Sequence, residues 1–423
     1  MELEKPPLFL DYRELLVFVV VMFVLIALRI SVLHSEYREF ISKPFFFTHA
    51  KVLHQYPKEG QYGTYKLLKL HTQEGLTLYL STRNQDFSNA NLRIQIFPTQ
   101  KIGFAEYLSG FFIKGYIKEV KYSNINVLKD VLTKSIKVQH THPDIKEFYL
   151  AIYLATPLSR EFRQKVATLG VSHLIALSGL HLSILSSVVF FILWLLYHPL
   201  QRHYFPYRNA FIDIGLVVLI ALGVYTYFVG MPPSLVRSYA MLVLAWIALI
   251  VGFELLSFEF LLVVVLLLLA LFPKLIVSLS LWFSIAGVFS IYLIDHYTRS
   301  IKSKMLKVLL FPIGIYLLML PLTHLFFDTT SPVQLGSPLL SLFFTFFYPI
   351  SMALHLIGWG GAMDDVLIKL FELGSESSYT MLLGWEVFLP YLILAFVSIW
   401  SRLSFYVLVL ISTLYALVLY IPL

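Results

Sequence analysis

The chain has 423 residues, of which 58% are hydrophobic and only 13% are charged, with a formal net charge of +7. Soluble domains carry about 25% charged and about 45–50% apolar residues, so this composition excludes a soluble globular protein and predicts a polytopic membrane protein. Cysteine is absent, which excludes disulfides and thiolate metal sites. The length leaves room for about ten membrane spans and one modest soluble domain.

The first apolar stretch runs from Leu15 to Leu33. It is longer than the apolar core of a signal peptide, and no small-residue cleavage site follows it. Residues 1–34 are therefore predicted to form an N-terminal signal-anchor helix.

Residues 35–147 form an extended polar segment with 16 Lys and Arg against 10 Asp and Glu. Apolar and polar residues alternate over 76–81 and 93–96, which is typical of half-buried β-strands. Three more runs of this kind, separated by Gly, Pro and Asn, lie at 45–53, 64–70 and 111–120. Five short strands in about 80 residues predict a small all-β domain, a closed or OB-like barrel.

Residues 148–423 are predicted to be a multi-span membrane domain. The loop 197–209 carries Arg202 and Arg208, and the loop 296–307 carries four Lys and Arg residues. An even number of spans separates these loops, so both are expected in the cytoplasm, with the β domain and residues 148–170 outside. The apolar runs are 171–196, 210–229, 235–252, 257–272, 276–294, 308–326, 338–358, 383–400 and 403–421.

The same count places the acidic stretch 361–378 inside the cell, together with its residues Asp364, Asp365, Glu372 and Glu376. This disagrees with the orientation of the other loops. A re-entrant segment within 338–378 would remove the conflict, because such a segment returns to the side from which it started.

Residues 157–169 have the pattern of an amphipathic interfacial helix. Arg160, Arg163 and Lys165 recur at helical spacing, with Phe162 and Val166 on the other side. Two interpretations remain open. The helix either anchors the chain at the lipid headgroups or forms a basic lip that guides phosphates towards a pore.

Residues 170–182 read GVSHLIALSGLHL, so polar and glycine residues interrupt the start of a long apolar run. Such residues are costly at membrane depth, which predicts a partly broken helix lining a polar path. The alternative is that His173, Ser178, Gly179 and His181 only pack against neighbouring helices. Neutral imidazole and hydroxyl groups can contact phosphate without holding it tightly.

This string resembles the signature of the ComEC family, whose usual form is G-x-x-H-L-L-A-I-S-G-L-H. ComEC proteins are the inner-membrane DNA channels of natural competence. The resemblance continues at 231–241 (MPPSLVRSYAM), at 272–288 and at 334–349 (QLGSPLLSLFFTFFYP). Relatives also carry an OB-like domain at the position of residues 35–147.

Arg237 matches an arginine that ComEC relatives place after a proline, and an arginine facing a polyanion is a natural phosphate guide. Snorkelling of Arg237 to the membrane interface is the alternative. In the OB-like domain, aromatic and basic side chains would stack on bases and contact phosphates of single-stranded DNA. The expected contacts there are Tyr62, Tyr65, Lys66, Tyr79, Arg83 and Arg93.

The resemblance implies a multi-pass protein of the bacterial cytoplasmic membrane that passes single-stranded DNA during natural transformation. It implies partners as well: an extracytoplasmic DNA receptor, a cytoplasmic helicase or motor, single-strand-binding proteins and, as a further option, a second copy of the chain. The resemblance is to a short form of the family without the C-terminal metallo-β-lactamase-like domain that many relatives carry, and no G-x-x-x-x-G-K-[ST] phosphate loop occurs. No ATP site, cofactor or enzymatic activity is therefore expected.

Other function classes remain as alternatives. The sequence ALSG at 176–179 is close to the G-x-S-G of rhomboid-type intramembrane hydrolases, with His324 or His355 as a conceivable base. A secondary transporter for a small anionic solute is another. The string HTHPD at 140–144 resembles the start of a metallo-β-lactamase motif, but Ile145 occupies the next histidine position, so no metal site is expected there.

Overall fold

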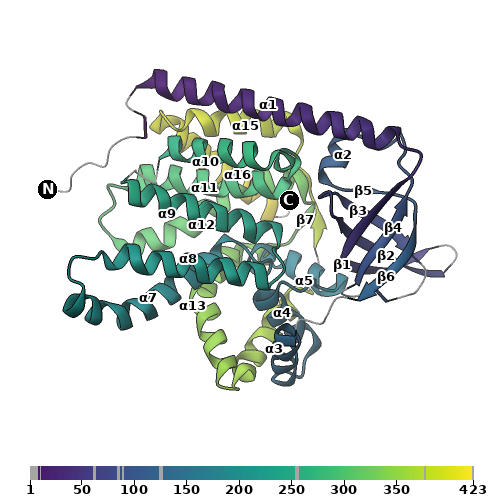
Figure 1. Cartoon of the computed structure of the whole chain (residues 1–423). Helices are drawn as coiled ribbons and strands as arrows, with labels where there is room; N and C mark the ends of the chain where they lie inside the picture. Colours follow the sequence, from purple (N-terminus) through teal and green to yellow (C-terminus); the bar gives the residue numbers. More distant parts are fainter. Residues whose placement is uncertain are drawn as a thin grey trace. The chain divides into compact units, whose positions relative to one another are not determined.

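The computed structural model describes residues 8–9, 11–60, 63–82, 86–87, 90–122, 127–252, 257–375 and 378–421 (Figure 1). Its contacts divide the chain into two compact units. The sheet unit comprises Phe9–Asp130 and Leu262–Leu281, and the helical unit comprises Val131–Leu261 and Trp282–Leu423. The helices α3 (Val127–Val138), α10 (Phe258–Leu271) and α11 (Leu279–Thr298) cross this division.

The sheet unit contains one six-stranded mixed sheet in the order β5-β3-β2-β1-β4-β6. Adjacent strands are antiparallel except β3 and β5, which are parallel. The strands are β1 (Phe46–Gly60), β2 (Gly63–Thr72), β3 (Thr77–Thr82), β4 (Ala90–Ile96), β5 (Phe111–Phe112) and β6 (Gly115–Tyr122), and two helices accompany them, α1 (Tyr12–Ser42) and α2 (Phe104–Ser109).

The alternating apolar residues of the strands form the core of this unit. Leu68, Leu78, Leu92 and Ile94 are completely buried, and Phe40 from α1 packs against them. Each buried side chain of this size stabilises the fold by about 1.5–3 kcal/mol. The predicted small β domain is therefore present as a mixed sheet, while the closed or OB-like barrel stays a prediction.

The loop between α10 and α11 belongs to the sheet unit. It forms the short helix η1 (Pro273–Val277), which packs on α1 and α2. The ammonium of Lys274 donates to the carbonyl of Gly75 at 2.8 Å, at a turn where Gly75 adopts a positive φ of 74°. Because these segments touch, the α10–α11 loop and the sheet must lie on the same side of a membrane.

Eight helices of the described residues are long and apolar enough to cross a membrane. They are α1, α7 (Gly179–Tyr204), α8 (Ala210–Phe228), α9 (Pro233–Val251), α11, α12 (Lys304–Phe326), the segment Pro332–Leu356 and α16 (Arg402–Tyr420). Two further apolar helices are shorter, α10 and α15 (Trp385–Val397). All ten predicted apolar runs are thus helical, and a multi-pass membrane protein is confirmed.

The polar segment before α7 folds into short helices that are not among these candidate spans. After α3 the chain forms α4 (Pro143–Leu154), α5 (Arg160–Thr168) and α6 (Ser172–Ile175). Tyr149 and Ile152 of α4 and Phe162 of α5 are fully buried, so the segment is a packed part of the helical unit.

The segment that follows β7 ends at β8, so it starts and ends at the same place in the fold. Thr329 pairs with Thr380 and Thr330 with Tyr379, which joins β7 (Thr329–Thr330) to β8 (Tyr379–Thr380). Between them lie η2 (Pro332–Gly336), α13 (Ser337–Leu356), η3 (Gly360–Met363) and α14 (Asp364–Leu373). We call α13, η3 and α14 the α13–α14 hairpin.

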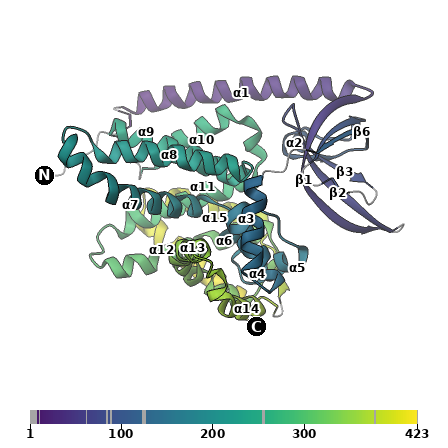
Figure 2. The same ribbon diagram turned by 60° about the horizontal axis from the view of Figure 1, so that its bottom comes forward.

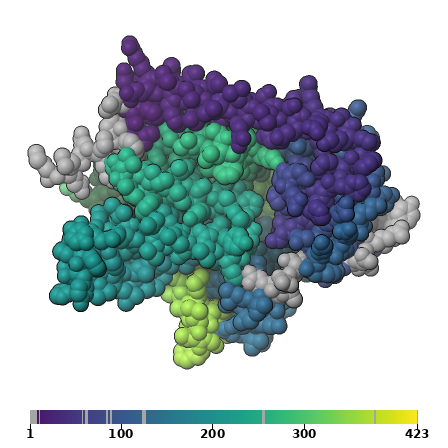
Figure 3. Space-filling view, viewed as in Figure 1, coloured from purple at the N-terminus to yellow at the C-terminus, as the bar shows by residue number. Residues whose placement is uncertain are grey.

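Both ends of α13 contact the segment of short helices. At one end the hydroxyl of Ser337 donates to the carbonyl of Gly170, and at the other His355 contacts His140. Figures 1 and 2 agree in placing α13 beside α4, and in Figure 3 the yellow-green α13 region adjoins the blue segment that includes α4. The hairpin thus has the connectivity of a re-entrant segment, which the sequence analysis proposed within 338–378 to explain the position of the acidic stretch.

Candidate functional site

The break between α6 and α7 is built by residues of the 170–182 string. Ala176 and Ser178 are extended, and α7 begins at Gly179. The backbone N–H of Ser178 donates to Nδ1 of His181 at 3.3 Å, and the Ser178 hydroxyl lies 3.3 Å from the same nitrogen. Ser178 and His181 therefore cap the start of α7. The predicted break in this helix is confirmed.

The start of α9 packs against this break. The hydroxyl of Ser234 donates to the carbonyl of Leu177 at 2.6 Å, which satisfies a backbone group that the broken helix leaves unbonded. A Cβ atom at Gly179 would lie 3.1 Å from the hydroxyl oxygen of Ser238, so glycine permits the close approach. Arg237 lies on this first turn-and-a-half of α9 and is only 5% exposed.

The helix α13 forms the other wall of the site. Nε2 of His173 lies 3.2 Å from the hydroxyl of Ser341. The ring of His181 meets the rings of Phe344 and Tyr348 edge-on, each with centroids 5.0 Å apart. Both histidines of the string therefore contact α13, about 170 residues further along the chain.

The predicted path residues fall into an exposed and a buried group. His173 is exposed, whereas His181 is 1% exposed and Arg237 is buried. Ser183 and Ser187, one and two turns into α7, are exposed as well.

The predicted basic helix is α5, which begins with Ser159 accepting from the N–H of Phe162. Arg160 and Arg163 are exposed and available to a phosphate. Lys165 differs, because its ammonium contacts the carboxylate of Asp144 at 2.7 Å. Of the three predicted cations, two remain on the open face.

The sheet unit carries an aromatic and basic surface on the outer face of β1, β2, β3 and β5, which we call the outer-face platform. The rings of Tyr79 and Phe112 stack with centroids 5.0 Å apart, and the ammonium of Lys69 lies 5.9 Å from the Tyr79 ring centroid. Phe112 is 68% exposed. A hollow of about 510 Å³ adjoins the stack, lined by Lys58, Tyr65, Leu67, Ser81, Thr82 and Phe112.

The other predicted DNA contacts lie elsewhere in the sheet unit. Lys66 neighbours Tyr65 on β2 and therefore points to the opposite face. Arg93, on β4, forms an ion pair with Glu119 at 3.2 Å and lies 5.8 Å from the Phe47 ring centroid. Tyr62 and Arg83 lie outside the described residues.

Sequence reasoning missed Lys69 and Phe112, which belong to the platform. Lys69 follows the alternation of β2, since it is opposite Tyr79 on the neighbouring strand. The alternation of side chains along β2 could therefore have identified Lys69 from the sequence. Phe112 joins the platform through the parallel pairing of β3 with β5, which local alternation does not reveal.

The histidines considered as bases for Ser178 are engaged elsewhere. The ring of His324 contacts the carbonyl of Leu320 and the hydroxyl of Thr330. The ring of His355 contacts Ser351 and His140. In the described part of the chain, no three His, Cys, Asp or Glu side chains form a metal-binding group.

The comparisons with known proteins agree with the helical architecture and the 170–182 string. A family described as Competence protein matches residues 155–419, which is more than half of the chain and includes the α6–α7 break, Arg237 and α13. No curated protein and no solved structure gives a match. The chain belongs to the competence protein family, as its resemblance to ComEC led us to expect.

Proposed function

We propose that this protein passes single-stranded DNA across the bacterial cytoplasmic membrane during natural transformation. The family supports a role in competence and DNA uptake in general. The observation that carries the finer proposal is that the broken helix contacts both the start of α9, through Ser234, and α13, through His173. A channel for a polyanion needs a wet, weakly binding path through apolar helices, and this site brings the exposed imidazole of His173 beside the hydroxyl of Ser341.

The orientation of the helices favours transport from outside inwards. The η1 loop lies with the sheet, and two helices separate η1 from the β7–β8 pair, so the pair falls on the same side as the sheet. The loops that carry Arg202, Arg208 and Lys302 then fall on the opposite side, which the positive-inside rule assigns to the cytoplasm. The sheet, α5 and the α13–α14 hairpin accordingly face the outside, where DNA arrives.

Arg237 and His173 have different roles in this proposal. Arg237 is buried beside the break, where its planar, permanently charged guanidinium supplies a positive potential and fixes the start of α9. His173 is exposed, and a neutral imidazole can donate to or accept from sugar and phosphate oxygens without trapping them. Arg160 and Arg163 of α5 would attract phosphates on the outer side.

The sheet unit would receive the strand before it enters the membrane. Aromatic rings with nearby ammonium groups bind single strands by stacking and phosphate contact, independently of sequence, and the outer-face platform has this composition. We propose an OB-like barrel for this unit. Its edge strands β5 and β6 are separated by only Ile113 and Lys114, so one short segment borders both edges of the sheet.

The proposal assigns no catalytic chemistry to the chain. The motor that pulls the strand, the external DNA receptor and the cytoplasmic single-strand-binding proteins would be separate partners. A second copy of the chain could complete the path.

Deletion of the gene followed by transformation with purified DNA tests the proposal. The deletion strain should still bring DNA into a protected compartment outside the cytoplasmic membrane but yield almost no recombinants. Recombinants at the wild-type frequency would exclude the channel. If the deletion strain loses both the external uptake of DNA and the recombinants, the protein would instead act in DNA capture.

A further inference from the structure

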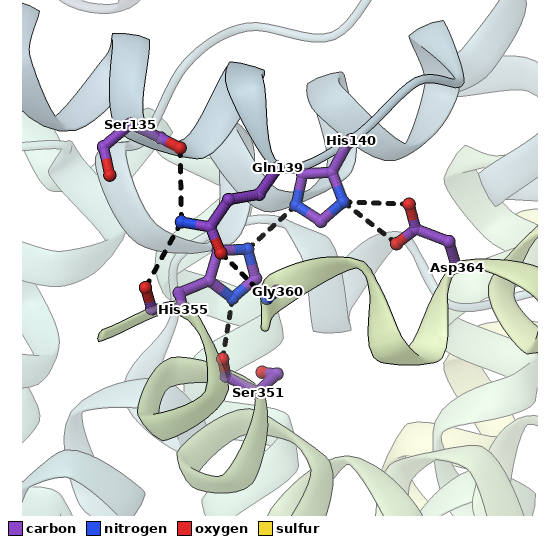
Figure 4. A network of polar contacts seen from close by, with 7 residues as sticks. All are labelled: Ser135, Gln139, His140, Ser351, His355, Gly360 and Asp364. Atoms are coloured by element: carbon purple, nitrogen blue, oxygen red, sulfur yellow. Dashed lines mark hydrogen bonds and ion pairs between the residues drawn. The ribbon is translucent and has the colours of Figure 1, made fainter. Parts of the chain in front are cut away.

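Two histidines from distant parts of the helical unit meet the carboxylate of Asp364 in a buried chain of polar contacts (Figure 4). Nδ1 of His140 lies 2.9 Å and 3.0 Å from the two oxygens of Asp364. Nε2 of His140 lies 2.9 Å from Nε2 of His355, and Nδ1 of His355 lies 2.7 Å from the carbonyl oxygen of Ser351. The His140 side chain is 0% exposed, and that of Asp364 is 14% exposed.

The partners determine where the protons are. A carbonyl oxygen only accepts, so Nδ1 of His355 carries a hydrogen, and its Nε2 is a lone pair when the ring is neutral. A carboxylate also only accepts, so Nδ1 of His140 carries a hydrogen. The two facing Nε2 atoms are then bonded only if one more proton lies between them. The chain of contacts therefore needs one proton more than a carboxylate and two neutral rings carry.

We propose that one shared proton on His140 and His355 acts as a pH-sensitive latch, which holds the α13–α14 hairpin against α4. Without the proton, two nitrogen lone pairs face each other at 2.9 Å. With a second proton, two cationic donors face each other. The closed contact is thus favoured by a single proton, and the titration belongs to the group as a whole.

The latch lies where the hairpin meets the segment of short helices. Gln139, next to His140, donates to the carbonyl of His355 and accepts from the N–H of Gly360, so the latch is framed by backbone contacts to the hairpin. Opening would release the end of α13 from α4. The same helix carries Ser341 and Phe344, which contact His173 and His181, so the latch can control the wall of the candidate site.

The other titratable groups that pack around the two rings are tyrosines of α4. The ring of Tyr149 stacks on His140 at 4.5 Å and meets His355 at 4.4 Å, and Tyr153 lies 5.3 Å from His355. Burial raises the pKa of Tyr149 and of Tyr153 above the usual value, so both stay neutral. Asp364 supplies the negative charge that opposes the imidazolium.

Thiol labelling of the full-length protein in detergent tests the latch, because the natural chain has no cysteine. Leu367 of α14 is buried against the segment of short helices, while its neighbour Val366 is exposed. The labelling rate of Leu367→Cys divided by that of Val366→Cys reports opening and cancels the pH dependence of the thiol. As the pH is raised, this ratio should rise by up to tenfold per pH unit over the range in which the shared proton leaves, since opening releases one proton.

Two variants distinguish the effect of the shared proton from the effect of side-chain packing alone. In His355→Gln the amide donates to the neutral His140 ring without the extra proton, so the ratio should stay low and flat across the pH range. In Asp364→Asn the imidazolium loses its counter-charge, and the ratio should be raised at every pH. A flat ratio in the otherwise native protein would overturn the proposal, and so would a His355→Gln ratio that rises as the native one does.

Discussion

The imidazole of His173 lies 3.2 Å from the hydroxyl of Ser341, although 168 residues separate them in the chain. This contact joins the string that identifies the family to a hairpin whose two ends are held together by the β7–β8 pair. The candidate path is therefore bounded by a helix whose hairpin starts and ends at the same place in the fold.

The two histidines of the string should differ in their access to water. A His173→Cys variant should react with a membrane-impermeant thiol reagent, and DNA in the channel should slow that reaction. His181→Cys should react roughly tenfold more slowly, because its position opens only by local unfolding. Labelling kinetics in transformation-competent membranes measure both. Equal rates would contradict the division into an exposed His173 and a buried His181.

Replacement of Arg237 should separate charge from geometry. Arg237→Lys keeps the positive charge but loses the planar fork, so partial transformation should remain, whereas Arg237→Ala should lose most of it. Arg202→Ala, at the exposed end of α7, is the control and should transform normally. Recombinant frequency per amount of membrane-inserted protein is the measurement. An Arg237→Ala variant with normal transformation would remove Arg237 from the path.

Replacement of Ser178 should distinguish a channel from a hydrolase. In a channel, Ser178→Ala loses only a helix cap, worth about 1 kcal/mol, and should still transform. Ser178→Phe should block, since a large ring cannot fit between α7 and α9. If Ser178 were a nucleophile, Ser178→Ala would be as inactive as Ser178→Phe. Transformation frequency, normalised to protein level, decides between the two outcomes.

The outer-face platform should bind single strands through stacking. In the full-length protein, Tyr79→Ala and Phe112→Ala should each weaken binding roughly tenfold, as stacking contributes about 1–3 kcal/mol per base. Lys69→Ala should weaken binding and flatten its salt dependence, because it removes a phosphate contact. Its neighbour Lys66→Ala, on the opposite face, is the matched control. Titration with a fluorescent oligonucleotide at several salt concentrations gives these values.

No effect of Tyr79→Ala or Lys69→Ala would mean that the sheet unit docks a partner protein instead of DNA. Salt-independent binding would point the same way, since contacts with phosphates release counterions.

The α13–α14 hairpin should be accessible from outside the cell. Lys369→Cys, on the exposed side of α14, should react with an impermeant reagent in intact spheroplasts. Lys302→Cys, in the basic loop before α12, should react only after permeabilisation, because positive loops stay in the cytoplasm. A Lys369→Cys that also needs permeabilisation would mean that α13 crosses the membrane.

Local patterns determined most of the secondary structure. Apolar runs predicted all ten apolar helices, because this signal depends on neighbours within a few residues. The strand pattern predicted five strands, and the run at 111–120 is divided in the structure into β5 and β6. Polar groups at 170–182 predicted a broken helix for the same local reason. The sequence also determined the family, since the 170–182 string is contiguous.

Only the tertiary structure decided which residues meet. The hairpin depends on the pairing of Thr329 with Thr380. The latch depends on the contacts of His140 with Asp364 and His355. The partners in each of these pairs are more than 50 residues apart along the chain. It also divided the predicted path residues, leaving His173 exposed while burying His181. A helix pattern gives the spacing of side chains around one axis, but the face that meets water depends on which other helices pack against it.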